Sequence, residues 1–343
     1  MLEKELQTLI INSSPNVYYL SGFTGTNATL FITLENSYLL TDFRYLEQAE
    51  KEAEQYEILR VDNDLLETLG MLAKGFSSVG IEEDYISWAD FRLMREALPA
   101  CVLLDASNIV SEMRQVKDEA EVEILRQAIT ITDQAFVQIL EKINPGITEE
   151  EIGLELEFAL RRRGASGRSF EFIVASGERS ALPHGVATAK NINRGELLTF
   201  DFGAKYKWYC SDLTRTLFVG EPKPKHREIY EIVLEAQEAA LGAIKPGLSG
   251  KEVDAVAREI IGKFGYGEYF GHGLGHSVGL EIHETPRLNT KENRILEPGM
   301  IITVEPGIYI PDWGGVRIED MALVTKNGVE VLTQAPKQFI IID

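Results

Sequence analysis

An internal repeat constrains the fold of this chain more than any other feature of its sequence. The segment INPGITEEEI, which begins at Ile143, recurs as IKPGLSGKEV, which begins 101 residues later at Ile244. Each copy places a Pro-Gly turn before a Thr or Ser that is followed three residues later by Glu, the signature of a helix capping box. The repeat predicts two related α+β units packed around a common sheet. A cleft between such pseudo-symmetric halves is a natural place for a site.

Residues 1–113 show a different pattern, in which short apolar segments alternate with amphipathic ones. Their lengths and spacing predict a separate α/β domain of modest size. The predicted strands are Val17–Leu20, Ala28–Ile32, Ser37–Leu40, Glu57–Val61, Val79–Glu82 and Val102–Asp105, and the predicted helices span 44–54, 64–73 and 88–98. A charged stretch then opens a long helix, so we place the boundary between this domain and a second one, residues 114–343, just before it.

The charge of the chain limits its partners. Its 343 residues include 34 Lys and Arg against 54 Asp and Glu, which gives a net charge of -20 at pH 7. This excess of negative charge repels phosphate backbones and anionic lipid, so we expect neither nucleic acid nor a membrane as a partner. The N-terminus has no basic start, and no apolar segment reaches the length of a membrane-spanning helix. These features predict a cytoplasmic protein.

Acidic residues recur inside segments that otherwise have the pattern of apolar strands. Residues 197–219 predict a β-hairpin with one aspartate in each strand, Asp201 and Asp212. With a turn centred on Tyr206 and Lys207, the two carboxylates are directly opposite each other and repel. The turn lacks an Asn-Gly signal, so a register shifted by one residue, with one aspartate facing water, stays open as an alternative.

Two glutamates show the same anomaly further along the chain. Glu305 lies in the apolar segment IITVEPGIYI, and Glu319 lies in VRIEDMALV, on the same strand face as Arg317. Taken singly, Glu305 is explained as an acid at the end of an edge strand, and Glu319 as the surface partner of an arginine. Taken together, four carboxylates in apolar strands are better explained by one cause, a cationic centre that makes their burial tolerable.

Three of the five histidines fall in the segment GHGLGHSVGLEIHE, residues 271–284. His272 and His276 have the spacing of a helical zinc motif, but the glycines make a helix costly here, each by about 1 kcal/mol relative to alanine. The segment therefore predicts a strand or a glycine-kinked loop, in which His283 takes the other face unless a bulge intervenes. Satisfied polar residues in a surface loop are the alternative interpretation.

The predicted donor set favours a pair of divalent ions. Four carboxylates contribute a charge of about -4 and two divalent ions about +4, so the site leaves no buried charge unpaired. Oxygen ligands combined with one imidazole favour Mn²⁺, with Co²⁺ or Zn²⁺ as alternatives.

Five short motifs resemble, in order and context, the metal-ligand motifs of the pita-bread metallopeptidases, a family that includes methionine aminopeptidase, aminopeptidase P and Xaa-Pro dipeptidase (prolidase). The matching residues are Asp201 in DFG, Asp212 in SDLTRT, His276 in HGLGHSVG, Glu305 in EPG and Glu319 in RIED. The segment TDFRY, residues 41–45, and the α/β pattern around it resemble the creatinase-type amino-terminal domain of the proline-specific members. The resemblance covers nearly the whole chain and implies a creatinase-like domain at 1–113 and a pseudo-two-fold catalytic domain at 114–343.

The resemblance also implies the roles of the metal ligands. Asp212 and Glu319 would bridge two divalent ions, Asp201 would complete one site, and His276 and Glu305 the other. A bridging water would be the nucleophile, and Glu305 would orient or deprotonate it.

Further roles follow from the same resemblance. His184 in LPHG and His283 in IHE would hold the substrate carbonyl or shuttle protons. His272, Arg287 and Arg317 would support substrate binding from around the metals. The remaining histidine, His226, is expected on the surface.

The implied substrate is a small peptide with proline in its second position. A free dipeptide presents a carboxylate, and Arg287 in HETPR is the predicted partner, so we expect an Xaa-Pro dipeptidase. An aminopeptidase P that acts on longer Xaa-Pro peptides is the alternative, and a metal-free peptide-binding pseudoenzyme is an alternative of another class. Relatives commonly dimerise, which predicts a homodimer.

Overall fold

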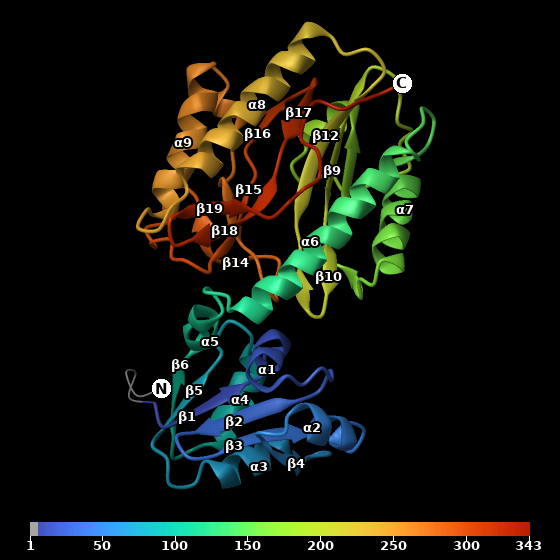
Figure 1. Ribbon diagram of the computed structural model, residues 1–343. Helices are drawn as coiled ribbons and strands as arrows, with labels where there is room; N and C mark the ends of the chain where they lie inside the picture. Colours follow the sequence, from blue (N-terminus) through green and yellow to red (C-terminus); the bar gives the residue numbers. More distant parts are fainter. Residues whose placement is uncertain (1–5) are drawn as a thin grey trace. The chain divides into compact units, whose positions relative to one another are not determined.

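The computed structural model describes residues 6–343 and divides the chain into two compact units, one that ends at Met113 and one that spans Arg114–Asp343 (Figure 1). The split falls in the charged stretch that precedes the first long helix. Among residues 6–343, no helix combines the length and the apolar character that crossing a lipid bilayer requires.

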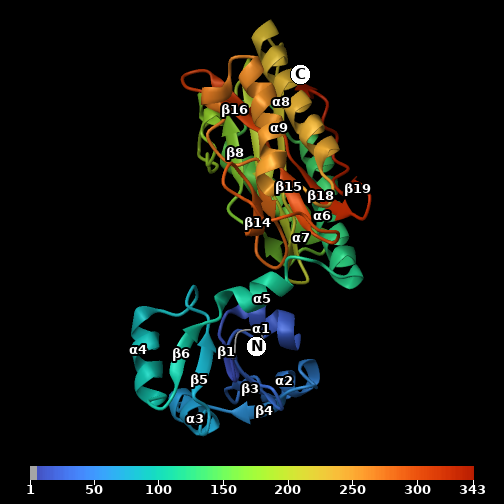
Figure 2. The ribbon, with the colours of Figure 1, turned by 90° about the vertical axis from the view of Figure 1, so that its left-hand side faces the viewer.

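The first unit is a six-stranded sheet with helices on both faces. The strands lie in the order β4-β3-β2-β1-β5-β6. They are β1 (Thr8–Ile11), β2 (Thr29–Thr33), β3 (Ser37–Thr41), β4 (Glu57–Arg60), β5 (Ser78–Ile81) and β6 (Val102–Asp105), and the helices are α1 (Ser14–Ser21), α2 (Leu46–Glu52), α3 (Leu65–Leu72), α4 (Trp88–Ala97) and α5 (Ser107–Met113). Alternate residues of the strands face two cores, one shared with α1, α2 and α5 and one with α3 and α4 (Figure 2).

One local prediction for this unit was wrong, and one strand was not predicted. The segment Val17–Leu20 is helical rather than extended, because Pro15 stands at the start of α1 and its fixed φ favours the first helical turn. Strand β1 was missed altogether. It lies in the middle of the sheet, antiparallel to β2 and parallel to β5, and all of its residues are buried, so it lacks the alternation that marks a half-buried strand.

The second unit packs two pairs of helices around strands. Helices α6 (Glu119–Leu140) and α7 (Glu149–Arg162) form one pair, and α8 (Pro224–Ala243) and α9 (Gly250–Lys263) form the other, with strands between the pairs (Figures 1 and 2). Each pair has its own apolar core against those strands. The two short 3-10 helices are Gly177–Ala181 and Gly267–Tyr269.

The strands of this unit form four separate ladders. A four-stranded sheet has the order β20-β12-β9-β8, a five-stranded one β14-β13-β15-β18-β19, and small ladders join β11-β10-β7 and β16-β17. The bounds are β7 (Gly167–Arg168), β8 (Ile173–Ser176), β9 (Glu196–Phe202), β10 (Ala204–Tyr206), β11 (Tyr209–Cys210), β12 (Leu213–Val219), β13 (Gly275–Ser277), β14 (Glu284–Leu288), β15 (Ile301–Val304), β16 (Gly307–Ile310), β17 (Gly314–Arg317), β18 (Asp320–Thr325), β19 (Gly328–Val331) and β20 (Ile341–Ile342). The expectation of one common sheet was therefore wrong in detail.

The repeat seen in the sequence is present in the structure. Helices α7 and α9 both begin with a complete capping box, built by Thr148 and Glu151 in one copy and by Ser249 and Glu252 in the other. In each copy the glycine of the Pro-Gly turn also donates a main-chain hydrogen bond to a segment that lies later in the chain. The N–H of Gly146 donates to the carbonyl of Ile192 at 2.8 Å, and the N–H of Gly247 donates to that of Leu296 at 3.1 Å. The predicted pseudo-symmetric helix starts are confirmed.

The hairpin that carries two of the aspartates has a different register from the predicted one. Asp201 pairs with Thr214 rather than with Asp212. The turn is formed by Lys207 and Trp208, which both have positive φ, at 44° and 74°. Positive φ at both central residues matches the right-handed twist of the flanking strands, but it is rarely adopted without Gly or Asn, so the sequence gives little sign of it.

Candidate metal centre

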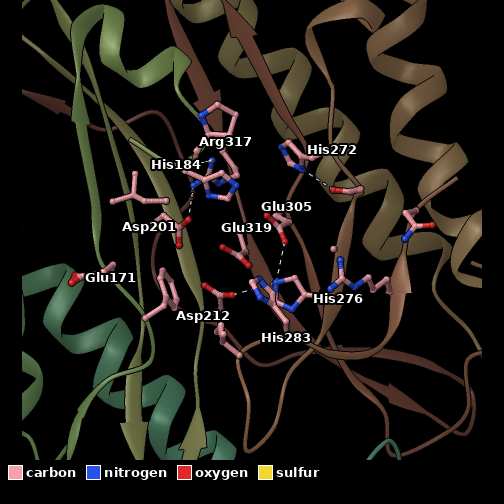
Figure 3. A pocket seen from close by; sticks show the side chains of 18 of the residues that line it. Glu171, His184, Asp201, Asp212, His272, His276, His283, Glu305, Arg317 and Glu319 are labelled. Atoms are coloured by element: carbon pink, nitrogen blue, oxygen red, sulfur yellow. Dashed lines mark hydrogen bonds and ion pairs between the residues drawn. The ribbon is translucent and has the colours of Figure 1, made fainter. Parts of the chain in front are cut away.

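A cavity of about 500 Å³ opens in the second unit, and every residue singled out by the sequence as a ligand, catalytic group or substrate contact lines it (Figure 3). These residues are His184, Asp201, Asp212, His272, His276, His283, Arg287, Glu305, Arg317 and Glu319. Apolar side chains, among them Phe170, Ile173 and Ile282, complete the lining. The size is in the range of cavities that bind small ligands.

Three carboxylates form the centre of this cavity. Asp201, Asp212 and Glu319 each offer one oxygen atom, and these oxygens lie within 4.8 Å of one another. Asp201 is near the end of β9, Asp212 directly precedes β12, and Glu319 directly precedes β18, so three chain segments contribute. Within residues 6–343, the buried Oδ1 of Asp212 and Oε1 of Glu319 have no hydrogen-bond partner.

The electrostatics of the cluster favour a bound cation. Burial raises the pKa of Asp212 well above its usual range, and the neighbouring charge of Glu319 raises it further. Burial likewise raises the pKa of Glu319, with the charges of Glu305 and Asp201 adding to the effect. Unpartnered, buried oxygens that repel one another are the donor set that hard divalent cations bind, so the residues present fit such ions.

His276 and Glu305 extend the cluster on one side. The Nε2 of His276 lies 3.6 Å from Oδ2 of Asp212 and 3.3 Å from Oε1 of Glu305. Burial alone would raise the pKa of Glu305, but the hydrogen bond and the charge of His276 outweigh burial and hold the pKa at about 2. Glu305 is thus an anion throughout the physiological range.

The histidine segment forms a short strand within an irregular loop, which agrees with the predicted strand or glycine-kinked loop, and its pairing contains a bulge. His276 lies in β13, and the pairing of β13 with β14 shifts between His276 and Ser277. The ring of His283 consequently packs at 81° to the ring of His276, with centroids 4.5 Å apart. Gly275 allows this strand to approach β15, because a Cβ there would lie 2.0 Å from the carbonyl oxygen of Thr303.

Arg317 is engaged by the protein on all sides of its guanidinium group. Its Nη2 lies 2.5 Å from Oδ2 of Asp201, its Nη1 donates to the hydroxyl of Tyr309 at 2.8 Å, and its Nε donates to Oγ1 of Thr214 at 3.1 Å. The hydroxyl of Tyr309 also contacts Nε2 of His272 at 2.8 Å. Arg317 and His272 therefore line the cavity and contact side chains of the site, and their part in substrate binding stays a prediction.

Arg287, unlike Arg317, leaves its guanidinium group free for a bound molecule. Its side chain is exposed in the cavity wall, and within residues 6–343 no ion pair or side-chain hydrogen bond engages its guanidinium group. A free, planar cation beside the carboxylate cluster suits an anionic group of a bound molecule.

Sequence reasoning missed several residues that position the carboxylates. The hydroxyl of Thr303 donates to Oε1 of Glu305 at 3.2 Å and accepts from the N–H of His276 at 3.0 Å. Thr214 and Tyr309 belong to the same group. All three lie in β-rich segments where threonine and tyrosine are ordinary residues, so no sequence signal marked them.

The expectation for His226 was wrong. The side chain is buried rather than exposed, because its ring packs 4.5 Å from the ring of Phe218 and 5.1 Å from that of Trp313. Its Nδ1 accepts a hydrogen bond from the N–H of Lys223 at 3.1 Å, which caps the start of α8. The charged neighbours in the sequence had suggested a surface position.

Comparison with known proteins assigns the two units. The model of metallopeptidase family M24 matches residues 123–326, and the model of the creatinase/prolidase N-terminal domain matches residues 1–116. The Xaa-Pro dipeptidase of Pyrococcus horikoshii is 41% identical over 342 residues, which cover 99% of this chain and 96% of the relative.

Solved structures are equally similar. The Xaa-Pro dipeptidase from Bacillus anthracis superposes with a TM-score of 0.97 at 47% identity and covers 99% of this chain and 96% of its own. The X-Pro aminopeptidase from Thermotoga maritima superposes with a TM-score of 0.92 at 39% identity and covers 98% of each chain. The chain described here therefore belongs to metallopeptidase family M24, with a creatinase/prolidase-type amino-terminal domain.

Proposed function

We propose that the protein is an Xaa-Pro dipeptidase, which hydrolyses the bond between the two residues of a dipeptide that ends in proline. The observation that carries the proposal is the cluster of Asp201, Asp212 and Glu319 in a cavity that also holds a free arginine. One buried oxygen each of Asp212 and Glu319 has no partner within residues 6–343, which suits divalent cations. Full-length relatives at 41% and 47% identity bear the name Xaa-Pro dipeptidase.

The site residues suggest how the chain would hold its metal ions. Oxygens of Asp201, Asp212 and Glu319 lie within 4.8 Å of one another. By the resemblance to the family, Asp212 and Glu319 would be shared by two divalent ions, with Asp201 completing one site and His276 and Glu305 the other. The family is one of metallopeptidases, which supports divalent metal ions as the cofactor. We propose Mn²⁺ as the ion, with Co²⁺ or Zn²⁺ as alternatives, because oxygen donors predominate.

The bound ions would supply an acidified water and polarisation of the scissile carbonyl. The protein side chains do the rest. Glu305 stays ionised, so it can accept the proton that the water loses on attack. His184 and His283 face the cavity and can donate hydrogen bonds to the carbonyl oxygen as negative charge develops there. Arg317 neutralises Asp201 and keeps that carboxylate in place.

The choice of a dipeptide rests on Arg287. A dipeptide carries its C-terminal carboxylate on the proline itself, close to the scissile bond, and the free guanidinium of Arg287 lies in the wall of the same cavity. In a longer peptide that carboxylate is replaced by an uncharged amide. An aminopeptidase that acts on longer peptides is the second candidate, supported by the similarity to the Thermotoga maritima enzyme.

The proposal is tested with metal-depleted protein. After treatment with a chelator, addition of Mn²⁺ should restore hydrolysis of Leu-Pro, while Leu-Gly, which lacks the proline ring, should be cleaved far more slowly. Faster cleavage of Leu-Pro-Gly than of Leu-Pro would identify an aminopeptidase instead. A protein that retains no metal and cleaves neither peptide would be a binding module.

Three further predictions concern the domain organisation, the oligomeric state and the cellular location of the protein. We propose that residues 1–113 and 114–343 are the creatinase-like and catalytic domains, that the protein is a homodimer, and that it acts in the cytoplasm. Light scattering coupled to size-exclusion chromatography tests the second of these directly.

A further inference from the structure

His184 lies on a loop whose regular structure is limited to one short 3-10 helix. The loop runs from the end of β8 through the 3-10 helix Gly177–Ala181 to Thr188, and the His184 side chain is exposed at the cavity. A histidine that donates to a substrate atom must be held to within a fraction of an ångström, and an exposed loop residue does not achieve this by packing. Hydrogen bonds hold the middle of the loop, from Arg317 to the carbonyl of Pro183 at 3.3 Å and from the N–H of Gly315 to the hydroxyl of Ser180 at 2.8 Å. The position of His184 depends on these contacts and on whatever fixes the ends of the loop.

A single buried carboxylate, that of Glu149 at the start of α7, contacts both ends of this loop. Its Oε1 accepts from the main-chain N–H of Ser176 at 2.8 Å and from the Ser176 hydroxyl at 2.9 Å. Its Oε2 accepts from the main-chain N–H of Thr188 at 3.1 Å and from the Thr188 hydroxyl at 2.8 Å. Glu149 is 0% exposed, so these contacts are protected from competition with water.

Arg179 carries the connection into the loop itself. Its Nε lies 3.0 Å from Oε2 of Glu149, and its Nη2 donates to the carbonyl of Val186 at 2.6 Å. Val186 is two residues from His184 along the chain. Glu149 therefore holds Ser176, directly before the loop, and Thr188, its last residue. It reaches a point beside His184 through one arginine.

The internal repeat shows that this glutamate is not needed to build the helix start. The corresponding position in the second copy is Gly250, which also begins its helix directly after the capping serine. A Cβ on Gly250 would lie 2.2 Å from the carbonyl oxygen of Arg287, so main chain fills the space there. In the first copy the Glu149 side chain occupies this position and contacts Ser176 and Thr188.

We propose that Glu149 is a positioning residue for His184, fixing the loop 177–188 so that the imidazole faces the reacting carbonyl. The inference rests on the proposed function, since it assigns His184 a part in peptide hydrolysis. Substitution of Glu149 should therefore lower turnover only when His184 is present.

A double-mutant cycle tests this dependence. Glu149→Gln keeps the size of the side chain but puts an NH₂ group where an oxygen accepted main-chain N–H donors. We expect kcat for Leu-Pro to fall by about 10- to 100-fold, as for a misplaced catalytic group, with KM changed far less. In the background of His184→Ala the same substitution should lower kcat by less than about twofold, because the residue it positions is already gone.

The matched control is Glu151→Gln, at the same helix start. Glu151 is exposed and binds only the capping residue Thr148. Glutamine also completes a capping box, so Glu151→Gln should leave kcat unchanged. Amide hydrogen exchange gives a readout that is independent of activity. Exchange within 177–188 should rise in Glu149→Gln and stay at the wild-type level in Glu151→Gln and His184→Ala. Arg179→Met removes the links to Glu149 and Val186 but leaves the contacts of Glu149 with Ser176 and Thr188, so it gives a second test if Glu149→Gln does not fold.

The outcomes separate the two proposals. If the wild-type protein does not cleave Leu-Pro, the proposed function fails, and hydrogen exchange in the loop still decides whether Glu149 holds it. If the wild type cleaves Leu-Pro but the effects of Glu149→Gln and His184→Ala multiply, Glu149 acts on turnover by another route and the positioning role is refuted. Unchanged exchange in the loop would refute it as well.

Discussion

The hydroxyl of Thr214 donates a 2.7 Å hydrogen bond to Oε2 of Glu319, while Oε1 of the same carboxylate is buried without a partner among residues 6–343. The threonine thus fixes the rotation of the carboxylate and leaves one oxygen for a ligand in the cavity. Arg317 donates to the same hydroxyl, which sets its orientation. The carboxylate of Glu319 is therefore oriented toward the cavity before any cation binds.

This relationship predicts the effect of Thr214→Val, which keeps the shape of the side chain and removes the hydroxyl. We expect the affinity for Mn²⁺ to fall by about 10- to 100-fold, the usual effect of losing a group that orients a metal ligand. Isothermal titration of metal-depleted protein measures it. Thr199→Val is the control, since Thr199 is equally buried in the neighbouring strand but bonds to Thr216 outside the carboxylate cluster.

A second prediction concerns the stability of the metal-free protein. Burial, together with Glu319, raises the folded-state pKa of Asp212, so the folded protein binds this proton more tightly than the unfolded chain does. The resulting stability is present below the unfolded pKa of about 3.9 and is lost as the pH rises through the raised folded value. Asp212→Asn removes this loss, so the metal-free variant should melt above the wild type at pH 8, and by a smaller margin at pH 5.

Saturating Mn²⁺ should reverse that order, because binding to the folded state stabilises the wild type far more than a variant that lacks a ligand. Thermal melts of both proteins at the two pH values, with chelator or with Mn²⁺, make the comparison. Both proteins contain the histidines whose pKa values are shifted, so the contribution of these histidines cancels when the two melting temperatures are compared. A metal-free wild type that melts higher than Asp212→Asn at pH 8 would contradict the account of the cluster.

A third prediction concerns the buried pair of Arg317 and Asp201. Arg317→Met leaves the carboxylate buried without its cation, which typically costs about 3–5 kcal/mol of folding free energy. Urea unfolding of metal-depleted protein measures the loss. Arg126→Met is the matched control, because its partner Glu330 is exposed and such surface pairs contribute about 1 kcal/mol or less. Equal losses in the two variants would show that the buried pair has no special role.

A fourth prediction concerns recognition of the dipeptide carboxylate. Arg287→Met should lower kcat/KM for Leu-Pro by about 10- to 100-fold, since a hydrogen bond to a charged group contributes about 1.5–3 kcal/mol. Leu-prolinamide lacks the carboxylate, so its cleavage should be nearly unaffected by the substitution. Arg294→Met, which removes a nearby arginine paired with Glu292, serves as the control. A loss of the same size on both substrates would rule out the assigned contact.

The sequence was most informative where a residue type conflicted with its surroundings. Asp201, Asp212, Glu305 and Glu319 stand in segments that have the pattern of apolar strands, and the structure places all four around one cavity. The repeat likewise predicted both capping boxes, because those depend on residues three positions apart. Local chemistry of this kind can be read from a single chain.

What could not be predicted depends on the tertiary structure. The hairpin register follows from a turn at Lys207 and Trp208, two residues whose types give no hint of positive φ. Tyr309 resembles any apolar strand residue until Arg317 and His272 are brought to its hydroxyl by other elements. The burial of His226 likewise depends on Phe218 and Trp313, which flank it only in the folded chain.

The close approach of main chain at Gly250 limits what a protein engineer can transplant between the duplicated halves. Moving the glutamate of α7 into α9 would drive its side chain into the backbone of Arg287, and the reverse exchange would empty a buried slot behind the loop 177–188. Chimeras that swap these helix starts should therefore fail in both directions, even though the capping residues beside them are interchangeable.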